Sequence, residues 1–278
     1  MKNFFLFYSV FYLFHFCAYA QELFVYTESA SNIPTNALTV RATNFMMRER
    51  IALNQQPLNS VNYRQAISAQ YGLSKELMLS TDAFMGEHSN GLGIYTKCRF
   101  LSLDDISRHF RMAMFARAST INGHIHQEEL DITGKNTGLE GGLIATQLFH
   151  RFSLSTSCSY LKALGNYING FPHTLSDQSI SYTLSFGKLF WPLVYKNFNE
   201  TSINGMIEFL GQSQIQKSAT YIDIAPSVQF IFHSQTRLDI GYKRELYGNM
   251  IRPYPNGFLI RFQYLFFDAL RKTANNLE

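Results

Sequence analysis

Three potential metal ligands alternate along a short polar segment of the chain. His124, His126 and Glu128 are separated by single residues, so in an extended conformation their side chains project to one side. Two imidazoles and a carboxylate are ligands that a divalent metal such as zinc accepts. Solvated polar residues in a loop produce the same pattern and are the more ordinary reason for it. The spacing therefore allows a metal site without requiring one.

Serine and histidine residues suggest a second kind of chemistry. Hydrolysis by a serine nucleophile needs a histidine base beside it and a carboxylate or amide that orients the base. The chain is rich in serine and contains His109, His150, His173 and His233, but no nucleophile-elbow motif surrounds any serine. It also lacks a phosphate-binding loop, a dinucleotide-binding fingerprint and a CxxC pair. We therefore expect no enzymatic activity and no cofactor.

Composition excludes several classes of protein before any element is assigned. Of the 278 residues, 46% are apolar, which is far too many for a disordered chain. The net charge of +4 is not accompanied by a cluster of Lys and Arg, so nucleic acid is not an expected partner. Three cysteines are too few for a disulfide framework. A folded protein without a nucleic-acid partner is expected.

Polar and apolar residues alternate through most of the chain after residue 21. In residues 179–187, four large apolar residues alternate with serine and threonine, and residues 151–161 and 256–267 show the same pattern. A period of two residues is that of a β-strand with one oily face. No stretch after residue 21 approaches the roughly 20 consecutive apolar residues that a transmembrane helix needs. The chain is therefore predicted to be all-β.

Twelve segments carry this alternation, and each is longer than a typical soluble strand. Soluble strands average about five or six residues, whereas tilted membrane strands need about nine to eleven. Because every backbone polar group must be paired in lipid, such strands have to close into a barrel. The sequence thus predicts a single twelve-stranded antiparallel transmembrane β-barrel of the outer-membrane type. The predicted strands are 37–46, 60–71, 75–86, 91–102, 108–120, 137–149, 151–163, 178–190, 201–213, 219–233, 236–247 and 256–267.

The lengths of the connections indicate which end of the barrel faces which side. Short turns join the second strand to the third, the sixth to the seventh and the tenth to the eleventh, as in periplasmic turns. The longest connections, 47–59, 121–136 and 164–177, fall at the opposite end. We expect them to be external loops, and we expect residues 121–136 to be exposed and dispensable for folding.

The first twenty residues have the parts of a secretory signal peptide. Lys2 precedes an apolar run that ends at Ala18-Tyr19-Ala20, a cleavage site of the small-x-small type. A retained membrane anchor is the alternative, but the run is short for a span. We expect cleavage and export to the outer membrane. The predicted parts of the chain are a signal peptide (1–20), a periplasmic N-terminal segment (21–36), the barrel (37–267) and a polar tail (268–278).

Charged residues recur on the polar face of the predicted strands, where nine basic residues face seven acidic ones. Charges in a barrel interior usually satisfy one another as cross-strand pairs. The functional alternative is a slightly cationic, water-filled lumen that favours anionic or neutral polar solutes. The candidate lumen-lining residues are Arg41, Arg64, Lys97, Arg99, Arg111, Arg117, Glu140, Arg151, Glu208, Asp223, Asp239, Lys243 and Arg261.

Two segments resemble parts of known outer-membrane barrels. Residues 71–79, YGLSKELML, look like the periplasmic hairpin of small-solute barrels, in which an aromatic-Gly-apolar-hydroxyl turn leads into an alternating strand. The last predicted strand, GFLIRFQYLFF, resembles the aromatic-ending signal that the barrel assembly machinery reads, although residues 268–278 follow it. The mature chain is similar to Bacteroidota outer-membrane barrel proteins of unassigned function, and more distantly to barrels grouped with aromatic-degradation transporters. This resemblance implies an outer-membrane location.

The expected function is passive or facilitated passage of a small polar solute through the barrel. The lipid bilayer of the outer membrane and the barrel assembly machinery are the other expected partners. A protein of a different class remains the alternative, namely a non-conducting structural or surface barrel. Its lumen would be closed by its own charge pairs, and its loops would bind a partner.

Overall fold

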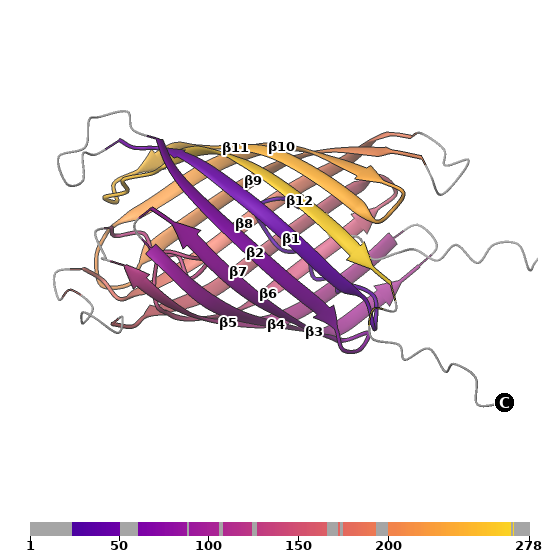
Figure 1. Ribbon diagram of the computed structural model, residues 1–278, viewed down its shortest axis with the longest axis horizontal. Helices are drawn as coiled ribbons and strands as arrows, with labels where there is room; N and C mark the ends of the chain where they lie inside the picture. Colours follow the sequence, from indigo (N-terminus) through magenta and orange to yellow (C-terminus); the bar gives the residue numbers. More distant parts are fainter. Residues whose placement is uncertain are drawn as a thin grey trace, which may run out of the picture.

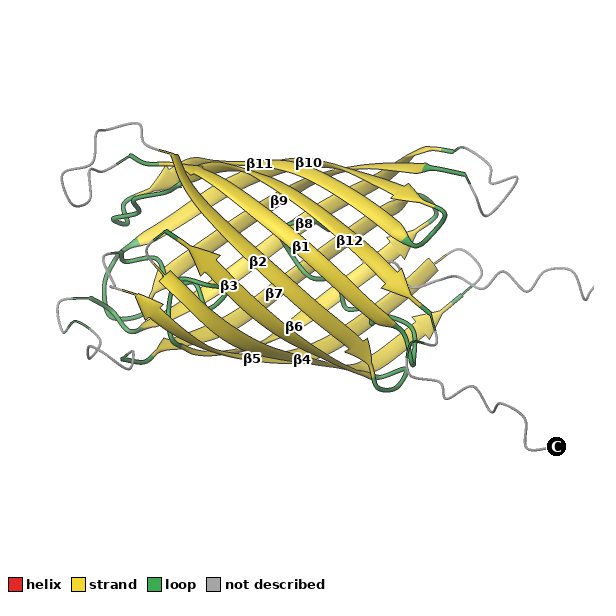
Figure 2. Cartoon of the chain, viewed as in Figure 1, coloured by secondary structure: helices red, strands yellow, loops and turns green. Residues whose placement is uncertain are grey.

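A single closed sheet forms the wall of the protein (Figure 1). The computed structural model describes residues 24–50, 61–87, 89–105, 108–123, 127–165, 172, 175–192, 200–267 and 269. These residues form twelve strands and no helix (Figure 2), so within them no helix could cross a membrane. The strands are β1 (Leu38–Arg48), β2 (Val61–Gly72), β3 (Leu77–Gly86), β4 (Ser89–Asp104), β5 (Arg108–Gly123), β6 (Gly138–Phe149), β7 (Phe152–Ala163), β8 (Gln178–Trp191), β9 (Ser202–Gln214), β10 (Thr220–Phe232), β11 (Thr236–Gly248) and β12 (Asn256–Phe266).

Antiparallel pairing runs without interruption around the barrel. Each strand pairs with its neighbours in sequence, and β1 closes the sheet against β12 with Leu38 opposite Phe266. Closure leaves no open sheet edge, which is the condition for strands to lie in lipid. The predicted twelve-stranded antiparallel barrel is therefore confirmed. The strand beginning near residue 137 is also confirmed, although three glycines interrupt its alternation.

The alternation in sequence separates an apolar outer surface from a polar interior. Leu154, Leu184 and Ile260 are 42%, 40% and 38% exposed, as expected for side chains that face lipid. On the opposite face of the same sheet, Ser155 is only 3% exposed and Ser185 is fully buried. Interior positions are thus shielded from solvent even though the barrel is wide.

The last described residues lie at the barrel end where β12 finishes (Figure 1), and there the N–H of Ala269 donates to the carbonyl of Asn36. Turns of two to four residues join β2 to β3, β4 to β5, β6 to β7 and β10 to β11 at this end, whereas β3–β4 and β9–β10 are joined by two and five residues at the other end. The connections β1–β2, β5–β6 and β7–β8 lie at the opposite end. The three longest predicted loops thus lie together at one end, and the assignment of that end to the cell exterior stays a prediction.

Two segments expected outside the barrel are instead folded into it. Residues 24–36, predicted as a periplasmic segment, are mostly buried against the inner wall, and we call them the strap. Residues 127–137, predicted as part of an exposed external loop, contain the buried Leu130, Ile132 and Asn136, and we call them the inward loop. Both predictions were wrong because the interior of the barrel offers polar partners to these segments. Residues 1–23 and 270–278, with the predicted signal peptide and most of the tail, lie outside the described residues.

The opposite faces of β8 provide a direct test of the register at one depth in the membrane. Replacing the outward-facing Leu184 by Arg is expected to reduce the free energy of unfolding by about 2–4 kcal/mol. The same change at its neighbour Thr183, which faces the interior, is expected to cost much less. Reversible unfolding of the two variants in lipid measures both values. Equal costs would show that the assignment of the faces is wrong.

Candidate functional site

The strap is anchored by one carboxylate on the inner wall. Glu208, at the middle of β9, is fully buried and accepts hydrogen bonds from three successive backbone N–H groups of the strap. The donors are Val25 at 3.0 Å, Tyr26 at 3.0 Å and Thr27 at 2.8 Å. A buried carboxylate is costly unless such donors satisfy it. Glu208 therefore fixes the upstream end of the strap against β9.

The rest of the strap crosses to the opposite wall. Lys97 of β4 donates to the carbonyl of Ser29 at 2.8 Å, and Arg111 of β5 donates to the hydroxyl of Ser31 at 2.9 Å. Between them, the N–H of Ala30 donates to the Thr146 hydroxyl of β6 at 2.9 Å. Since β9 and β4 are separated by four strands on one side and six on the other, the strap spans the lumen.

Two glycines allow the strap to approach the wall closely. A Cβ atom at Gly72, the last residue of β2, would lie 2.2 Å from the carbonyl oxygen of Pro34. A Cβ atom at Gly241 on β11 would lie 2.7 Å from the ring of Tyr26. Any larger residue at either position would displace the strap. The wall is thus shaped to hold the strap at both ends.

The inward loop reaches the wall opposite to the strands from which it starts. The side-chain amide of Gln212 on β9 bonds both the N–H and the carbonyl of Leu130, at 2.9 and 2.8 Å. Gln214, two residues further along β9, donates to the carbonyl of Glu128 at 2.7 Å. The loop leaves β5 and returns to β6, so these bonds draw it across the external end of the lumen.

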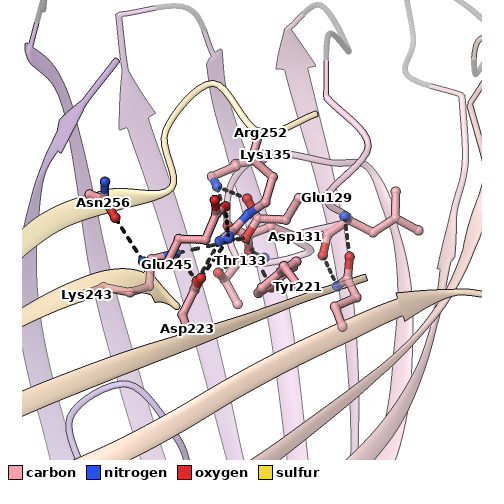
Figure 3. Close-up of polar contacts among 12 residues, drawn as sticks. Glu129, Asp131, Thr133, Lys135, Tyr221, Asp223, Lys243, Glu245, Arg252 and Asn256 are labelled. Carbon is pink, nitrogen blue, oxygen red and sulfur yellow. Dashed lines mark hydrogen bonds and ion pairs between the residues drawn. The ribbon is translucent and has the colours of Figure 1, made fainter. Parts of the chain in front are cut away.

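A buried arginine holds the inward loop in place (Figure 3). Arg252, in the connection between β11 and β12, is fully buried and bonds both carboxylate oxygens of Asp223, at 2.7 and 2.6 Å. The same guanidinium contacts Glu129 of the loop at 3.2 Å and Glu245 of β11 at 3.1 Å. It also lies 3.6 Å from the ring centre of Tyr221. We call these five residues the latch.

Electrostatics keep the acidic groups of the loop ionised. Burial alone would raise the pKa of Glu129, but the charges of Arg252, Lys135 and Lys243 hold that pKa well below its usual range. The pKa of Asp131 is likewise lowered, because Arg64 and Lys135 outweigh the effect of burial. Both carboxylates therefore remain charged at neutral pH and need their cationic partners.

A chamber of about 310 Å³ remains between the strap and the inward loop. Tyr26, Thr27 and Glu28 of the strap contribute to its lining, as do loop residues from Glu129 to Lys135. Strands β7 and β8 contribute only hydroxyl groups, those of Ser157, Ser181 and Thr183, whereas other strands contribute aromatic rings and long charged side chains. The chamber is thus a space of small-molecule size inside the barrel, lined by charged, hydroxyl and aromatic side chains.

Every cation that lines the chamber has an acidic partner. The six pairs are Arg41–Glu28, Arg64–Asp131, Arg117–Glu140, Lys135–Glu129, Lys243–Asp223 and Arg261–Asp239, at 3.0 to 3.8 Å. Three of these carboxylates belong to the strap and the loop, which the sequence placed outside the barrel. The cations of the chamber lining are therefore held in ion pairs.

The candidate lumen residues divide into three groups in the structure. Six line the chamber, namely Arg41, Arg64, Arg117, Glu140, Lys243 and Arg261. Lys97, Arg111 and Glu208 hold the strap, while Asp223 belongs to the latch and Asp239 pairs with Arg261.

The last two candidates lie elsewhere. Arg99, at the periplasmic end of β4, donates to the carbonyl of Lys75 at 2.8 Å. Arg151 lies in the turn between β6 and β7 rather than on a strand. Neither residue is part of the chamber lining.

Sequence reasoning missed Arg252, Glu28 and the charged residues of the inward loop. All of them lie outside the alternating segments, so the pattern that identified the lumen residues could not find them.

The proposed metal ligands are only partly placed. His124 and His126 lie outside the described residues. Glu128 accepts a hydrogen bond from the N–H of Ile251 at 2.9 Å and lies 3.5 Å from the ammonium of Lys217. In the part of the chain that the structure describes, no three His, Cys, Asp or Glu residues are grouped so that they could hold a metal. The metal site remains a prediction.

Comparison with known proteins shows a shared fold. The sequence matches no protein-family model and no curated protein. An outer-membrane channel from Pseudomonas putida F1 is similar in structure, with a TM-score of 0.56 and 12% identity over 87% of this chain and 100% of that chain. The KdgM porin is similar with a TM-score of 0.50 and 8% identity over 83% of this chain and 99% of that one. The chain thus has the barrel fold of outer-membrane channels.

Removing the charge of Glu208 is expected to release the strap. In Glu208→Gln the amide can no longer accept all the N–H donors, and each lost charge-assisted bond costs about 1.5–3 kcal/mol. We expect chymotrypsin to cleave after Tyr26 faster in this variant than in the unmodified protein. Glu140→Gln is the matched control, because Glu140 bonds Arg117 and Ser159 but not the strap. Similar cleavage in both variants would refute the anchoring role.

Breaking the latch is expected to release the inward loop. Arg252→Leu leaves three buried carboxylates short of a cation, and removing one partner of a buried pair costs about 3–5 kcal/mol. Trypsin should then cut after Lys135 about tenfold faster or more, as peptide mapping of the folded protein would show. The control is Arg108→Gln, which removes an equal charge from an exposed residue at the start of β5, at the other end of the barrel from the latch. If Lys135 stays protected in Arg252→Leu, the latch does not hold the loop.

Proposed function

We propose that this protein is an outer-membrane channel for the passive or facilitated passage of small polar solutes. The observation that carries the proposal is the polar chamber within a barrel whose outer surface is apolar. A lumen that only had to be stable could be filled with apolar side chains. Here it retains space, hydroxyl groups and paired charges, which suit the binding and release of a polar solute.

The small side chains of two adjacent strands favour an open path. Ser157 of β7 and Ser181 and Thr183 of β8 all line the chamber. Hydroxyl side chains of this size cannot reach across a barrel of twelve strands. Any path through the chamber would therefore follow this wall, opposite the arginines of β1, β2 and β5.

The strap and the inward loop would act as two constrictions in series. The chamber lies between them, so a solute from outside would pass the loop first and the strap second. Small apolar clusters, such as Val25 with Met206 and Leu130 with Leu161, seat each segment on the wall, and polar contacts fix its path. Such contacts can be exchanged for contacts with solute or water, which makes selective passage compatible with two crossings of the lumen.

The proposal includes the route by which the protein reaches the membrane. Residues 1–20 would direct export and be removed, and the barrel assembly machinery would insert the chain through its aromatic-ending last strand. Passage along the lumen would need neither a cofactor nor a catalytic step. The resemblance to Bacteroidota barrels and to aromatic-degradation transporters stays a prediction.

The same two segments favour a second candidate, a structural or partner-binding barrel that does not conduct. Both cross the lumen and are fixed to the opposite wall, which is more obstruction than wall side chains alone would provide. In that case the chamber would be a space left by packing, and the loops at the external end would carry the function.

Conductance distinguishes the two candidates. We expect the unmodified protein in a planar bilayer to show small single-channel steps, and Arg252→Leu to show steps several-fold larger, because the loop no longer narrows the lumen. Arg108→Gln should behave like the unmodified protein. If correctly folded protein gives no current and no solute uptake into liposomes, with or without the latch, the structural barrel replaces the channel.

A further inference from the structure

One acidic residue in the chamber differs from the others in its partners. Asp82, on β3, lines the chamber, and its only hydrogen bond within the described residues comes from the hydroxyl of Ser80 at 3.3 Å. The other acidic residues of the chamber lining all lie within 4.0 Å of a lysine or arginine. Among the described residues, Asp82 has no lysine or arginine within 4.0 Å, and Arg117, which feels its charge, is already paired with Glu140.

An aromatic ring covers the position beside this carboxylate on the neighbouring strand. Asp82 is opposite Gly93 of β4 and Ser68 of β2, so neither neighbour carries a long side chain. The ring of Phe84, two residues further on the same face of β3, lies over Gly93, where an added Cβ atom would be only 3.0 Å from it. A carboxylate and an aromatic ring therefore lie side by side at the edge of the chamber.

The cations around Asp82 are bound elsewhere. Arg117 lies 3.0 Å from Glu140 and 4.8 Å from the ring centre of Tyr95, which fixes its position between these two groups. Arg64 lies 3.1 Å from Asp131 and 4.6 Å from the ring centre of Phe45. Turning either guanidinium toward Asp82 would leave another carboxylate without its partner, which is costly inside the barrel.

We propose that Asp82 and Phe84 form a binding site for the ammonium group of an organic cation. An alkylammonium ion donates hydrogen bonds to a carboxylate and is attracted to the face of an aromatic ring. Asp82 supplies the first partner and Phe84 the second, while the hydroxyl oxygens of Ser68 and Ser80, which also line the chamber, can accept the remaining N–H groups. The inference deepens the proposed function, on which it rests, by naming the class of solute that the chamber retains.

An anionic solute fits the same chamber less well. To bind one, an arginine of the lining would have to give up its carboxylate, and the displaced carboxylate would remain in the chamber beside Asp82. A cation meets no such competition, because Asp82 has no ion-pair partner to lose among the described residues. The chamber therefore selects cations, contrary to the anion preference expected from the strand residues alone.

Binding of three probes of equal size tests the site without requiring conductance. Butylammonium, 1-butanol and butyrate would each be titrated into full-length protein in a neutral detergent at constant salt, and binding followed by ligand-observed NMR. We expect saturable binding of butylammonium only. Asp82→Asn should weaken it by about tenfold or more, and Phe84→Leu by a few-fold.

The matched control is Glu76→Gln, which removes one negative charge from the exposed turn between β2 and β3 and should leave binding unchanged. Butylammonium binding that is absent, or equal in Asp82→Asn, would overturn the site. If the protein binds butylammonium through Asp82 yet gives no current, the site stands and the channel proposal fails. A heat-dependent shift in electrophoretic mobility would confirm that each variant has a folded barrel.

Discussion

Backbone hydrogen bonding in lipid is the constraint from which the rest of this structure follows. Every N–H and C=O of the twelve strands must find a partner within the sheet, so the sheet has to close between β1 and β12. A closed barrel of twelve strands is wider than inward side chains can fill. The interior must therefore contain water, solute or another part of the chain. Both the strap and the inward loop occupy this space, and each replaces water as a partner of polar wall residues.

Charge pairing decides how these two segments are held. Wall residues such as Lys97, Arg64 and Asp223 would be expensive to bury alone, because the interior solvates an isolated charge poorly. Glu28 of the strap approaches Lys97 within 3.5 Å, and Asp131 of the loop approaches Arg64 within 3.1 Å. In each case the wall and the inserted segment satisfy one another. The segments thus complete the electrostatics of the wall as well as narrowing its lumen.

The sequence was sufficient to predict the wall but not its contents. Alternation at a period of two marks a strand and its inner face at once, which is why Glu208 and Arg117 could be assigned to the interior. No alternation identifies Glu28, Glu129 or Arg252 as interior residues. A charged residue in a segment without alternation can face solvent or a lumen equally well. Their positions follow from three-dimensional partners, such as Asp223 for Arg252, that lie far apart in sequence.

The numbers of positive and negative residues on the strands of the wall differ from those that a solute would meet in the chamber. The wall count includes Arg111 and Lys97, which are used to hold the strap, and Arg99 and Arg151, which lie outside the chamber lining. Conversely, it omits the carboxylates that the strap and the loop bring in. What a solute meets is the charge left after all pairs have formed. We infer that in this chamber the local charge of Asp82, which has no ion pair within 4.0 Å among the described residues, matters more to a solute than the excess over the whole wall.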